Sequence, residues 1–452
     1  LVDLDPGDVP AHNLTISIYD GDVKVAEAVM DGTVDADATP VTLVDGIDED
    51  IKADFAQANP TYQETTPDHL EIKDLPRYKS DGSRYNYRIV EGTKLAEWNA
   101  QTSYDPDTHE TTIVNMPADG VGANVALEKD WVDGGDSSHR LAVEIEFYAK
   151  EDITKDGETV YAKDEILPIL ILGEDGNLKK VDSVTITEDD TWFRTAMIMG
   201  VTDADLSKVG VRETYLVSSG ADGVDPASYE VLTYDEARKK YEDSEQVPSW
   251  VNTGWGYEDS GFNNADLERV STGEHVYEVS YKSATAEESP YELPTFYVSN
   301  RRIGLVNISI EKTWKDGATK AADRPDAVYR ISCDDPKAVF DVDDEGRATV
   351  TLNNGNTLPL FEEDPDLSGE APKRLTGKVE TDENGRTTLL VSVPKGADDE
   401  NTVTTGICGL PKYDGNGTVV SYSVTEEWAD ENHTGYASSL SEPTYTTGVW
   451  HF

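Results

Sequence analysis

The sequence GLPKY at residues 409–413, followed by YSVTE at residues 422–426, decides the fold of this chain. The same pair of motifs occurs near the N-terminus, as DLPRY at residues 74–78 and YRIVE at residues 87–91. The spacing from the first tyrosine to the glutamate is identical in the two copies. A degenerate third copy lies between them, as MGV at residues 199–201 and VGVRE at residues 209–213. Three copies of one turn-and-strand cassette predict a tandem array of one structural module.

The rest of the chain is dominated by alternation of apolar and polar residues. Residues 14–19 (LTISIY) and 306–310 (VNISI) alternate with the period of a half-buried strand, and Asp-Gly and Asn-Gly turns separate such runs. This pattern predicts an all-β fold of tandem immunoglobulin-like sandwiches in an elongated array. One helix is expected, over residues 235–242, where Thr233 and Glu236 form a capping box.

Aligning the cassettes predicts the module boundaries. Near-identical strands, VALEKDW at 125–131 and ISIEKTW at 308–314, open two modules, and TTIVN at 111–115 and FYVSN at 296–300 close two. We therefore expect modules at residues 1–118, at 122–302 with an insertion at about 216–290, and at 304–452 with an insertion at about 336–400. The first begins at a strand that aligns with the second strand of the others, so its Lys-x-Trp strand is missing. The third stops two residues before its expected closing Asn.

Composition excludes several classes of function. The chain has 452 residues, and 90 acidic against 38 basic residues give a formal net charge of -52. Such a charge repels nucleic acid and opposes adsorption to an anionic membrane. No apolar run approaches the length of about 18 residues that a membrane span needs. No signal peptide or anchor is visible, so we interpret the chain as a monomeric fragment of a longer protein.

No enzymatic or metal-binding motif is visible either. The seven His residues are scattered and build no hydrolase motif. The acidic turn at residues 341–345 lacks the spacing of an EF-hand loop. We therefore expect no cofactor and no metal.

The motifs together resemble the Cna protein B-type (CnaB-like) domains of Gram-positive surface proteins and pili. The matching pieces are KTW at 312–314, RPD at 324–326, and the two motifs at 409–413 and 422–426, and the resemblance covers nearly the whole chain apart from the insertions. It implies an isopeptide bond between a Lys amine and an Asn amide, assisted by a Glu or Asp. That chemistry needs a neutral, desolvated Lys and a protonated acid, held in contact with the amide.

Carried onto this sequence, the resemblance implies a bond between Lys129 and Asn300 with Glu213 as the assisting acid. Glu144 and Glu146, on a neighbouring strand, are alternative acids. The other interpretation is that all of these are ordinary strand residues.

The outer modules each supply only part of the set. The third supplies Lys312 and Glu426 but no visible Asn. The first supplies Glu91 and Asn115 but no visible Lys.

Two further groups of residues carry open alternatives. Cys333 and Cys408 form a disulfide, as an extracellular protein favours, or remain two buried thiols. The insertion of the second module is rich in aromatic residues that either contact a ligand or form a satellite core. These residues are Trp250, Trp255, Tyr257 and Phe262.

The resemblance implies a structural stalk segment of a Gram-positive cell-surface adhesin, attached to the cell wall through an anchor outside this fragment. Self-crosslinking is single-turnover chemistry, so the chain is not expected to be an enzyme. One alternative is an adhesin region that binds a host glycan or protein through the insertion. Another is a pilin polymerised by a sortase, although no pilin-type Lys motif and no sorting signal are visible.

Overall fold

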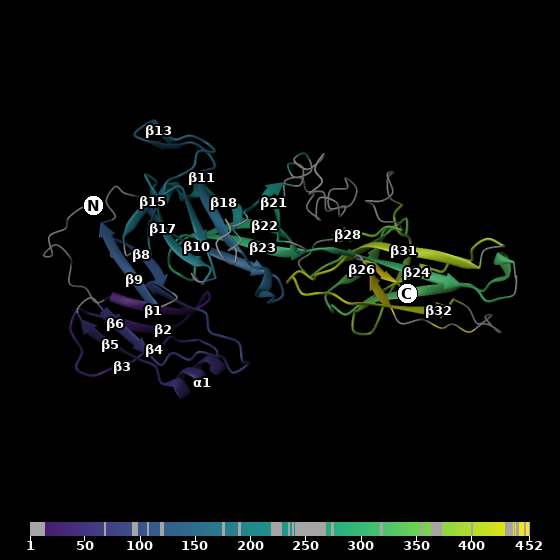
Figure 1. Ribbon diagram of the computed structural model, residues 1–452, viewed down its shortest axis with the longest axis horizontal. Helices are drawn as coiled ribbons and strands as arrows, with labels where there is room; N and C mark the ends of the chain where they lie inside the picture. Colours follow the sequence, from purple (N-terminus) through teal and green to yellow (C-terminus); the bar gives the residue numbers. More distant parts are fainter. Residues whose placement is uncertain are drawn as a thin grey trace. The chain divides into compact units, whose positions relative to one another are not determined.

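The computed structural model describes residues 14–66, 69–92, 98–105, 108–117, 122–173, 177–188, 191–217, 228–233, 236, 239, 268–272, 275–316, 320–353, 355, 357–362, 373–398, 401–429, 437, 439, 443–446 and 449–451. The chain divides into two compact units (Figure 1). The first comprises Leu1–Asp130, Leu141–Ser228 and Tyr281–Val298. The second comprises Trp131–Arg140, Tyr229–Ser280 and Ser299–Phe452. No helix among the described residues has the length and apolar character that crossing a membrane requires.

The repeated cassette folds as the same hairpin at both ends of the chain. The amide of Lys79 donates to the carbonyl of Ser83 at 2.8 Å, and the amide of Asp414 donates to the carbonyl of Thr418 at 2.9 Å. These two bonds lie at equivalent cassette positions. The repetition in the sequence is therefore a repetition of backbone structure.

A tyrosine explains the fixed spacing within the cassette. The hydroxyl of Tyr87 donates to the carbonyl of Pro76, and the hydroxyl of Tyr422 donates to the carbonyl of Pro411, both at 2.8 Å. Each bond ties the strand to the turn that precedes it. In the degenerate copy the equivalent residue is Val209, which has no hydroxyl to make this bond.

The glutamate of each cassette occupies an equivalent place in a sheet. The strand that carries it pairs antiparallel with the strand that aligns across the three modules: β7 (Tyr87–Glu91) with β1 (Leu14–Asp20), β18 (Val209–Val217) with β11 (Ala142–Ala149), and β32 (Tyr422–Trp428) with β25 (Ala327–Cys333). Directly opposite the glutamates lie buried apolar or aromatic residues, in the pairs Ile16–Glu91, Ile145–Glu213 and Tyr329–Glu426.

The first unit is built from small antiparallel sheets. One has the order β4-β2-β1-β7, with β2 at Val23–Met30 and β4 at Thr42–Leu43. The same part of the sequence forms two more sheets. They are β3-β5-β6, at Thr39–Pro40, Thr61–Thr66 and His69–Lys73, and the hairpin β8-β9, at Trp98–Asp105 and Glu110–Pro117.

Two further sheets of this unit surround the degenerate cassette. One has the order β16-β11-β18-β19, with β16 at Ser183–Ile186 and β19 at Ser228–Glu230. The other includes the run β15-β14-β17-β10-β23, at Leu178–Val181, Ile169–Leu172, Phe193–Met199, Gly122–Val132 and Thr295–Ile303. The hairpin β12-β13 (Ile153–Lys155, Glu158–Tyr161) and the 3-10 helix η2 (Asp203–Lys208) complete it.

A helix that the sequence pattern did not predict lies in the first unit. Helix α1 (Glu49–Ala58) begins where the Asp48 side chain accepts a hydrogen bond from the Asp50 amide, and ends at Asn59 in the left-handed conformation, with φ 52°. The expectation that the chain has one helix was therefore wrong, whereas the helix predicted at residues 235–242 is not contradicted. That segment lies outside the described residues except for 236 and 239, but its capping box is confirmed. The Glu236 amide donates to the Thr233 hydroxyl, and the Thr233 amide donates to the Glu236 carboxylate.

The second unit contains a two-layer β-sandwich. One layer has the order β31-β24-β34-β33, at Thr402–Pro411, Leu305–Thr313, Val449–His451 and Thr444–Thr446. The other has the order β29-β30-β25-β32, with β29 at Lys378–Thr381 and β30 at Thr387–Ser392. A third sheet of this unit is β26-β27-β28, at Val339–Val342, Ala348–Thr351 and Thr357–Pro359. The unit also contains the strands β22-β21-β20, at His275–Ala284, Glu268–Thr272 and Leu232–Thr233. Its 3-10 helices are η1 (Ser137–His139) and η4 (Ala321–Asp323). Strands β10, β19, β22 and β23 each run through parts of both units.

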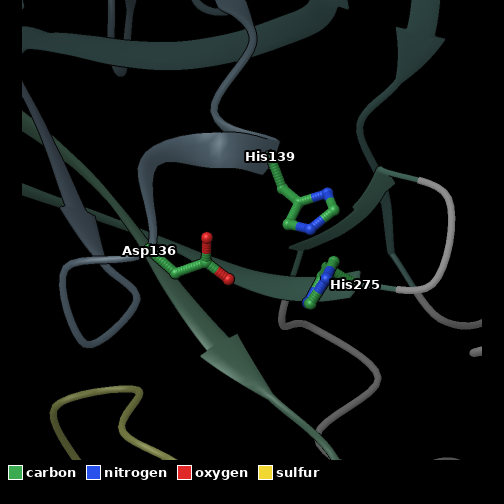
Figure 2. A group of neighbouring side chains, drawn as sticks. All are labelled: Asp136, His139 and His275. Carbon is green, nitrogen blue, oxygen red and sulfur yellow. The ribbon is translucent and has the colours of Figure 1, made fainter.

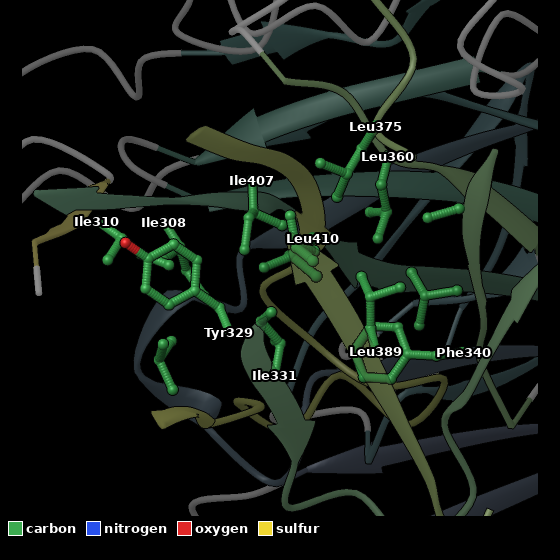
Figure 3. Packing of buried hydrophobic residues seen from close by; sticks show 14 of the residues in the cluster. Ile308, Ile310, Tyr329, Ile331, Phe340, Leu360, Leu375, Leu389, Ile407 and Leu410 are labelled. Carbon is green, nitrogen blue, oxygen red and sulfur yellow. The ribbon is translucent and has the colours of Figure 1, made fainter. Parts of the chain in front are cut away.

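One continuous core holds the sandwich together (Figure 3). Ile308 and Ile407 come from one layer, Tyr329 and Leu389 from the other, and Phe340 from the third sheet of the unit. Each is at most 1% exposed. Burying a side chain of this size contributes about 1.5–3 kcal/mol, so these residues stabilise the packing of the two layers. The all-β sandwich predicted from the sequence is confirmed.

Candidate functional site

A buried lysine and a buried glutamate meet in the first unit. Lys129 lies on β10, and Glu213 lies on β18 of a different sheet. The Lys129 Nζ atom is 3.5 Å from Glu213 Oε2, and both side chains are fully buried, at 0% exposed. Nζ is also 3.2 Å from the carbonyl oxygen of Asp130 and 3.5 Å from that of Val298. The amine therefore faces an acid inside the protein.

Asn300 lies on the same strand as Val298, two residues further along. Alternate residues of a strand point to the same face, so Asn300 shares a face of β23 with Val298. Its side chain is completely buried, at 0% exposed. The sequence-based candidates Lys129 and Glu213 are thus brought together, and Asn300 follows the strand segment that the Lys129 amine contacts.

The two alternative acids of this module are engaged elsewhere. Glu144 Oε1 accepts a hydrogen bond from the hydroxyl of Ser183 at 2.6 Å. Glu146 forms an ion pair with Arg212 at 3.0 Å. Of the three acids considered, Glu213 is the one whose carboxylate lies beside the Lys129 amine.

Burial has a direct chemical consequence for this pair. Removing an ammonium and a carboxylate from water costs several kcal/mol for each ion, and a separation of 3.5 Å recovers only part of that cost. A neutral amine beside a protonated acid avoids the cost. Those are the states in which an amine is a nucleophile and a carboxyl is a proton donor.

The equivalent pair in the second unit is closer and less buried. Lys312 Nζ is 2.6 and 2.8 Å from the two oxygens of Glu426, and the side chains are 14% and 8% exposed. The Trp314 and Trp428 rings lie 4.8 and 5.6 Å from the Lys312 amine. This geometry is that of an ion pair in an aromatic cage.

The last strand of this sandwich pairs directly with its opening strand. Strand β34 runs parallel to β24, with Asn307 opposite Val449 and Ser309 opposite His451.

The first cassette contains the complementary half of the site. The side-chain amide of Asn115 on β9 donates to Glu91 Oε2 at 2.8 Å. Burial raises the pKa of the Glu91 carboxyl, and the hydrogen bond from Asn115 opposes part of that rise. An acid and an amide are therefore in contact, with the amide nitrogen as the donor.

One repeated feature beside the lysines was missed from the sequence. In Lys129-x-Trp131 and Lys312-x-Trp314 the pattern extends by two residues to an aspartate that binds a downstream arginine. Arg140 Nε donates to Asp133 at 2.7 Å, and Arg324 Nε donates to Asp316 at 2.7 Å. Reading the motif as Lys-x-Trp-x-Asp followed by Arg finds both pairs. Each pair fixes the loop that leaves the lysine strand.

The remaining candidates are less informative. Cys333 and Cys408 form no disulfide in the structure. Burial is the main cause that raises the pKa of the Cys333 thiol to about 12. Trp250, Trp255, Tyr257 and Phe262 lie outside the described residues, so ligand contact through the insertion stays a prediction.

Comparison with known proteins gives matches among solved structures alone. No family profile and no curated protein matches the chain. The chain is similar to two B repeat units of the collagen-binding protein of Staphylococcus aureus, at 11% identity over 98% of this chain and 68% of that chain, with a TM-score of 0.25. A single B repeat unit of the same protein matches at 15% identity over 49% of this chain and 87% of that chain, with a TM-score of 0.22. The major pilin of Streptococcus pyogenes matches at 13% identity over 69% of this chain and 83% of that chain, with a TM-score of 0.17.

These TM-scores are low, so the fold assignment rests on the strand pairing of this chain. Its antiparallel sheets, its two-layer sandwich and its repeated cassette define an all-β protein. The fold is thus an all-β one with a β-sandwich, in keeping with the motifs by which the sequence resembles CnaB-like domains.

Proposed function

We propose that this chain is a structural segment of a Gram-positive cell-surface protein, and that an isopeptide bond between Lys129 and Asn300 closes its second module. The observation that carries the proposal is the fully buried Lys129 amine, 3.5 Å from the buried Glu213 carboxyl. Removing a lysine and an acid completely from water costs free energy of desolvation, and forming a strand does not require this.

The reaction needs only groups of this chain. The neutral Lys129 amine attacks the side-chain carbonyl carbon of Asn300, while protonated Glu213 donates a hydrogen bond to the carbonyl oxygen. Glu213 then relays a proton from the attacking nitrogen to the leaving amide nitrogen, which departs as ammonia. One C–N bond forms and one breaks, and Glu213 ends in its starting state. The bond forms once per molecule, so the chain is not an enzyme with turnover.

The bond would have a mechanical consequence. It would join the opening strand β10 to the closing strand β23 and so enclose roughly 170 residues, which is worth on the order of 5 kcal/mol by the loop-closure argument used for disulfides. A pulling force applied to the two ends of the module would pass through the covalent bond. The strands between would be bypassed.

The organisation that we propose has three modules, at residues 1–118, 122–302 and 304–452. Two of them show the cassette hairpin with its Tyr87 or Tyr422 hydroxyl bond, and all three place a glutamate opposite a buried residue. The net charge of -52 keeps such an array soluble and apart from anionic surfaces. A location outside the cell, on a wall-anchored protein, follows from the proposed role as a stalk.

The experiment that tests the bond compares two isosteric substitutions within one module. Glu213→Gln keeps the volume of the side chain but removes the acid, and we expect it to leave Lys129 and Asn300 in separate tryptic peptides. Glu144→Gln is the matched control, because Glu144 bonds Ser183 and not the lysine. We expect the control to retain a crosslinked peptide that contains both residues. A crosslinked peptide in Glu213→Gln, or its absence from both the wild type and the control, contradicts the proposal.

A further inference from the structure

Three potential metal ligands converge in the second unit (Figure 2). They are Asp136, His139 and His275, and their ligand atoms all lie within 4.8 Å of one another. The two imidazole rings have centroids 3.8 Å apart and an interplanar angle of 39°. In Figure 2 the Asp136 carboxylate and both rings point toward one common space. Two imidazoles and one carboxylate are a set of ligands that divalent transition metals take.

The loop that carries two of these ligands is held in place before any ion binds. Arg140 Nε and Nη2 donate to the two oxygens of Asp133 at 2.7 and 2.8 Å. Arg302 Nη1 donates to Asp136 Oδ2 at 2.8 Å, and its Nη2 donates to the carbonyl of Asp133. A fixed loop lowers the entropy cost of assembling ligands around an ion.

The ligand groups also have capacity for an ion. His275 Nδ1 is buried and has no hydrogen-bond partner among the described residues. Asp136 Oδ1 accepts from both the amide and the hydroxyl of Ser138, and Oδ2 accepts from Arg302, which leaves a second lone pair on Oδ2 for an ion.

We propose that Asp136, His139 and His275 bind one zinc-like divalent transition-metal ion, with water in the fourth position. Nitrogen ligands favour zinc over calcium or magnesium, which prefer an all-oxygen shell. The surplus of 52 negative charges on the chain raises the local concentration of cations.

Such an ion would join two segments that are far apart in the sequence. Asp136 and His139 lie on the loop that follows β10, and His275 begins β22. The ion would tie the loop and the strand together at the edge of the predicted insertion. The third module has the same Asp–Arg pair at Asp316 and Arg324 but no histidine in its loop, so the site is specific to the second module.

The test is calorimetric titration of the untagged full chain with zinc chloride, after removal of metals by EDTA and in an excess of magnesium that saturates weak carboxylate sites. We expect one zinc per chain, and a loss of affinity of about tenfold or more in His139→Ala and in His275→Ala, because even the loss of a partner outside the ligand shell costs about 10–100-fold. His69→Ala is the matched control, since His69 is an exposed strand residue, and it should bind zinc as the wild type does.

A second variant and a second measurement guard against misfolding. His139→Asn keeps a polar side chain, and its circular dichroism should match that of the wild type while zinc binding is weakened. Zinc should also raise the thermal unfolding temperature of the wild type but not that of the two histidine variants. Absence of stoichiometric binding, or equal binding by the wild type, His139→Ala and His275→Ala, overturns the proposal.

Discussion

Arg88 gives the most quantitative prediction about how the first unit is held together. Its guanidinium, 4% exposed, is 2.8 Å from Glu128 Oε1 and donates to the Thr191 carbonyl at 3.0 Å. It also donates to the Tyr291 hydroxyl and lies 5.2 Å from the centre of the Phe193 ring. One side chain on the first cassette strand β7 therefore fixes β10 and its neighbours.

Replacing Arg88 by Met retains the apolar contact with Phe193 but removes every donor. Glu128, 13% exposed, would keep only the hydroxyl of Tyr291 at 3.0 Å. Breaking a buried pair in this way lowers the free energy of unfolding by about 3–5 kcal/mol. Because Glu128 keeps the Tyr291 hydroxyl as a partner, we expect a loss near the lower end, about 3 kcal/mol.

Arg330→Met is the matched control on the surface. Arg330 is 30% exposed and pairs with Glu380 and Glu427, which are 56% and 58% exposed. Exposed pairs of this kind contribute about 0–1 kcal/mol. Hydrogen exchange read by mass spectrometry gives a free energy of opening for each segment, which avoids assuming two-state unfolding of a chain with two units. We expect Arg88→Met to lower protection from exchange in β1 and β7. A decrease in the free energy of opening no larger than that caused by Arg330→Met would refute the reasoning.

Three further predictions follow from single contacts. Tyr422→Phe removes the hydroxyl bond that ties strand to turn and should cost about 1–3 kcal/mol in the local unfolding free energy, measured by hydrogen exchange. Asn115→Leu should raise the pKa of Glu91 further, because the hydrogen bond that lowers it is lost, and carboxyl NMR titration measures the change. The pKa of Glu91 is higher in the folded than in the unfolded state. Its contribution to stability is therefore present at acid pH and is lost as the pH rises through the folded-state pKa. Iodoacetamide at pH 8 should modify Cys333 slowly in the native protein, and both Cys333 and Cys408 quickly after unfolding without reductant.

Each of these predictions has its own contrary result. Tyr87→Phe removes the equivalent bond, so an effect in one tyrosine variant and none in the other would contradict the shared role. An unchanged or lowered pKa of Glu91 in Asn115→Leu would show that the amide bond does not act on the acid. Fewer than two reactive thiols after unfolding would indicate the disulfide alternative.

The parts of the fold that the sequence predicts are those set by local contacts. The spacing of the cassette follows from bonds within a hairpin, such as that from Tyr422 to Pro411, so a single repeated motif reveals it. The pairing of Lys129 with Glu213 was implied by the resemblance to CnaB-like domains, supported by the same order of residues in neighbouring modules. Helix α1 was missed because it buries one residue, Phe55, and therefore lacks an apolar stripe. The grouping of His275 with His139 depends on how a distant strand meets a loop, and no periodicity in the sequence encodes that.

The most direct test of the central claim is the intact mass of the purified wild-type chain. Formation of the Lys129–Asn300 bond expels one ammonia, so the mass should be about 17 Da below the sum of the residues, and Lys129→Met should show no such deficit against its own sequence. One deficit is expected and not three, because among the described residues the Lys312–Glu426 pair meets no Asn and the Asn115–Glu91 pair meets no Lys. A wild-type mass equal to the sum of its residues would contradict the crosslink and leave only the β-sandwich array.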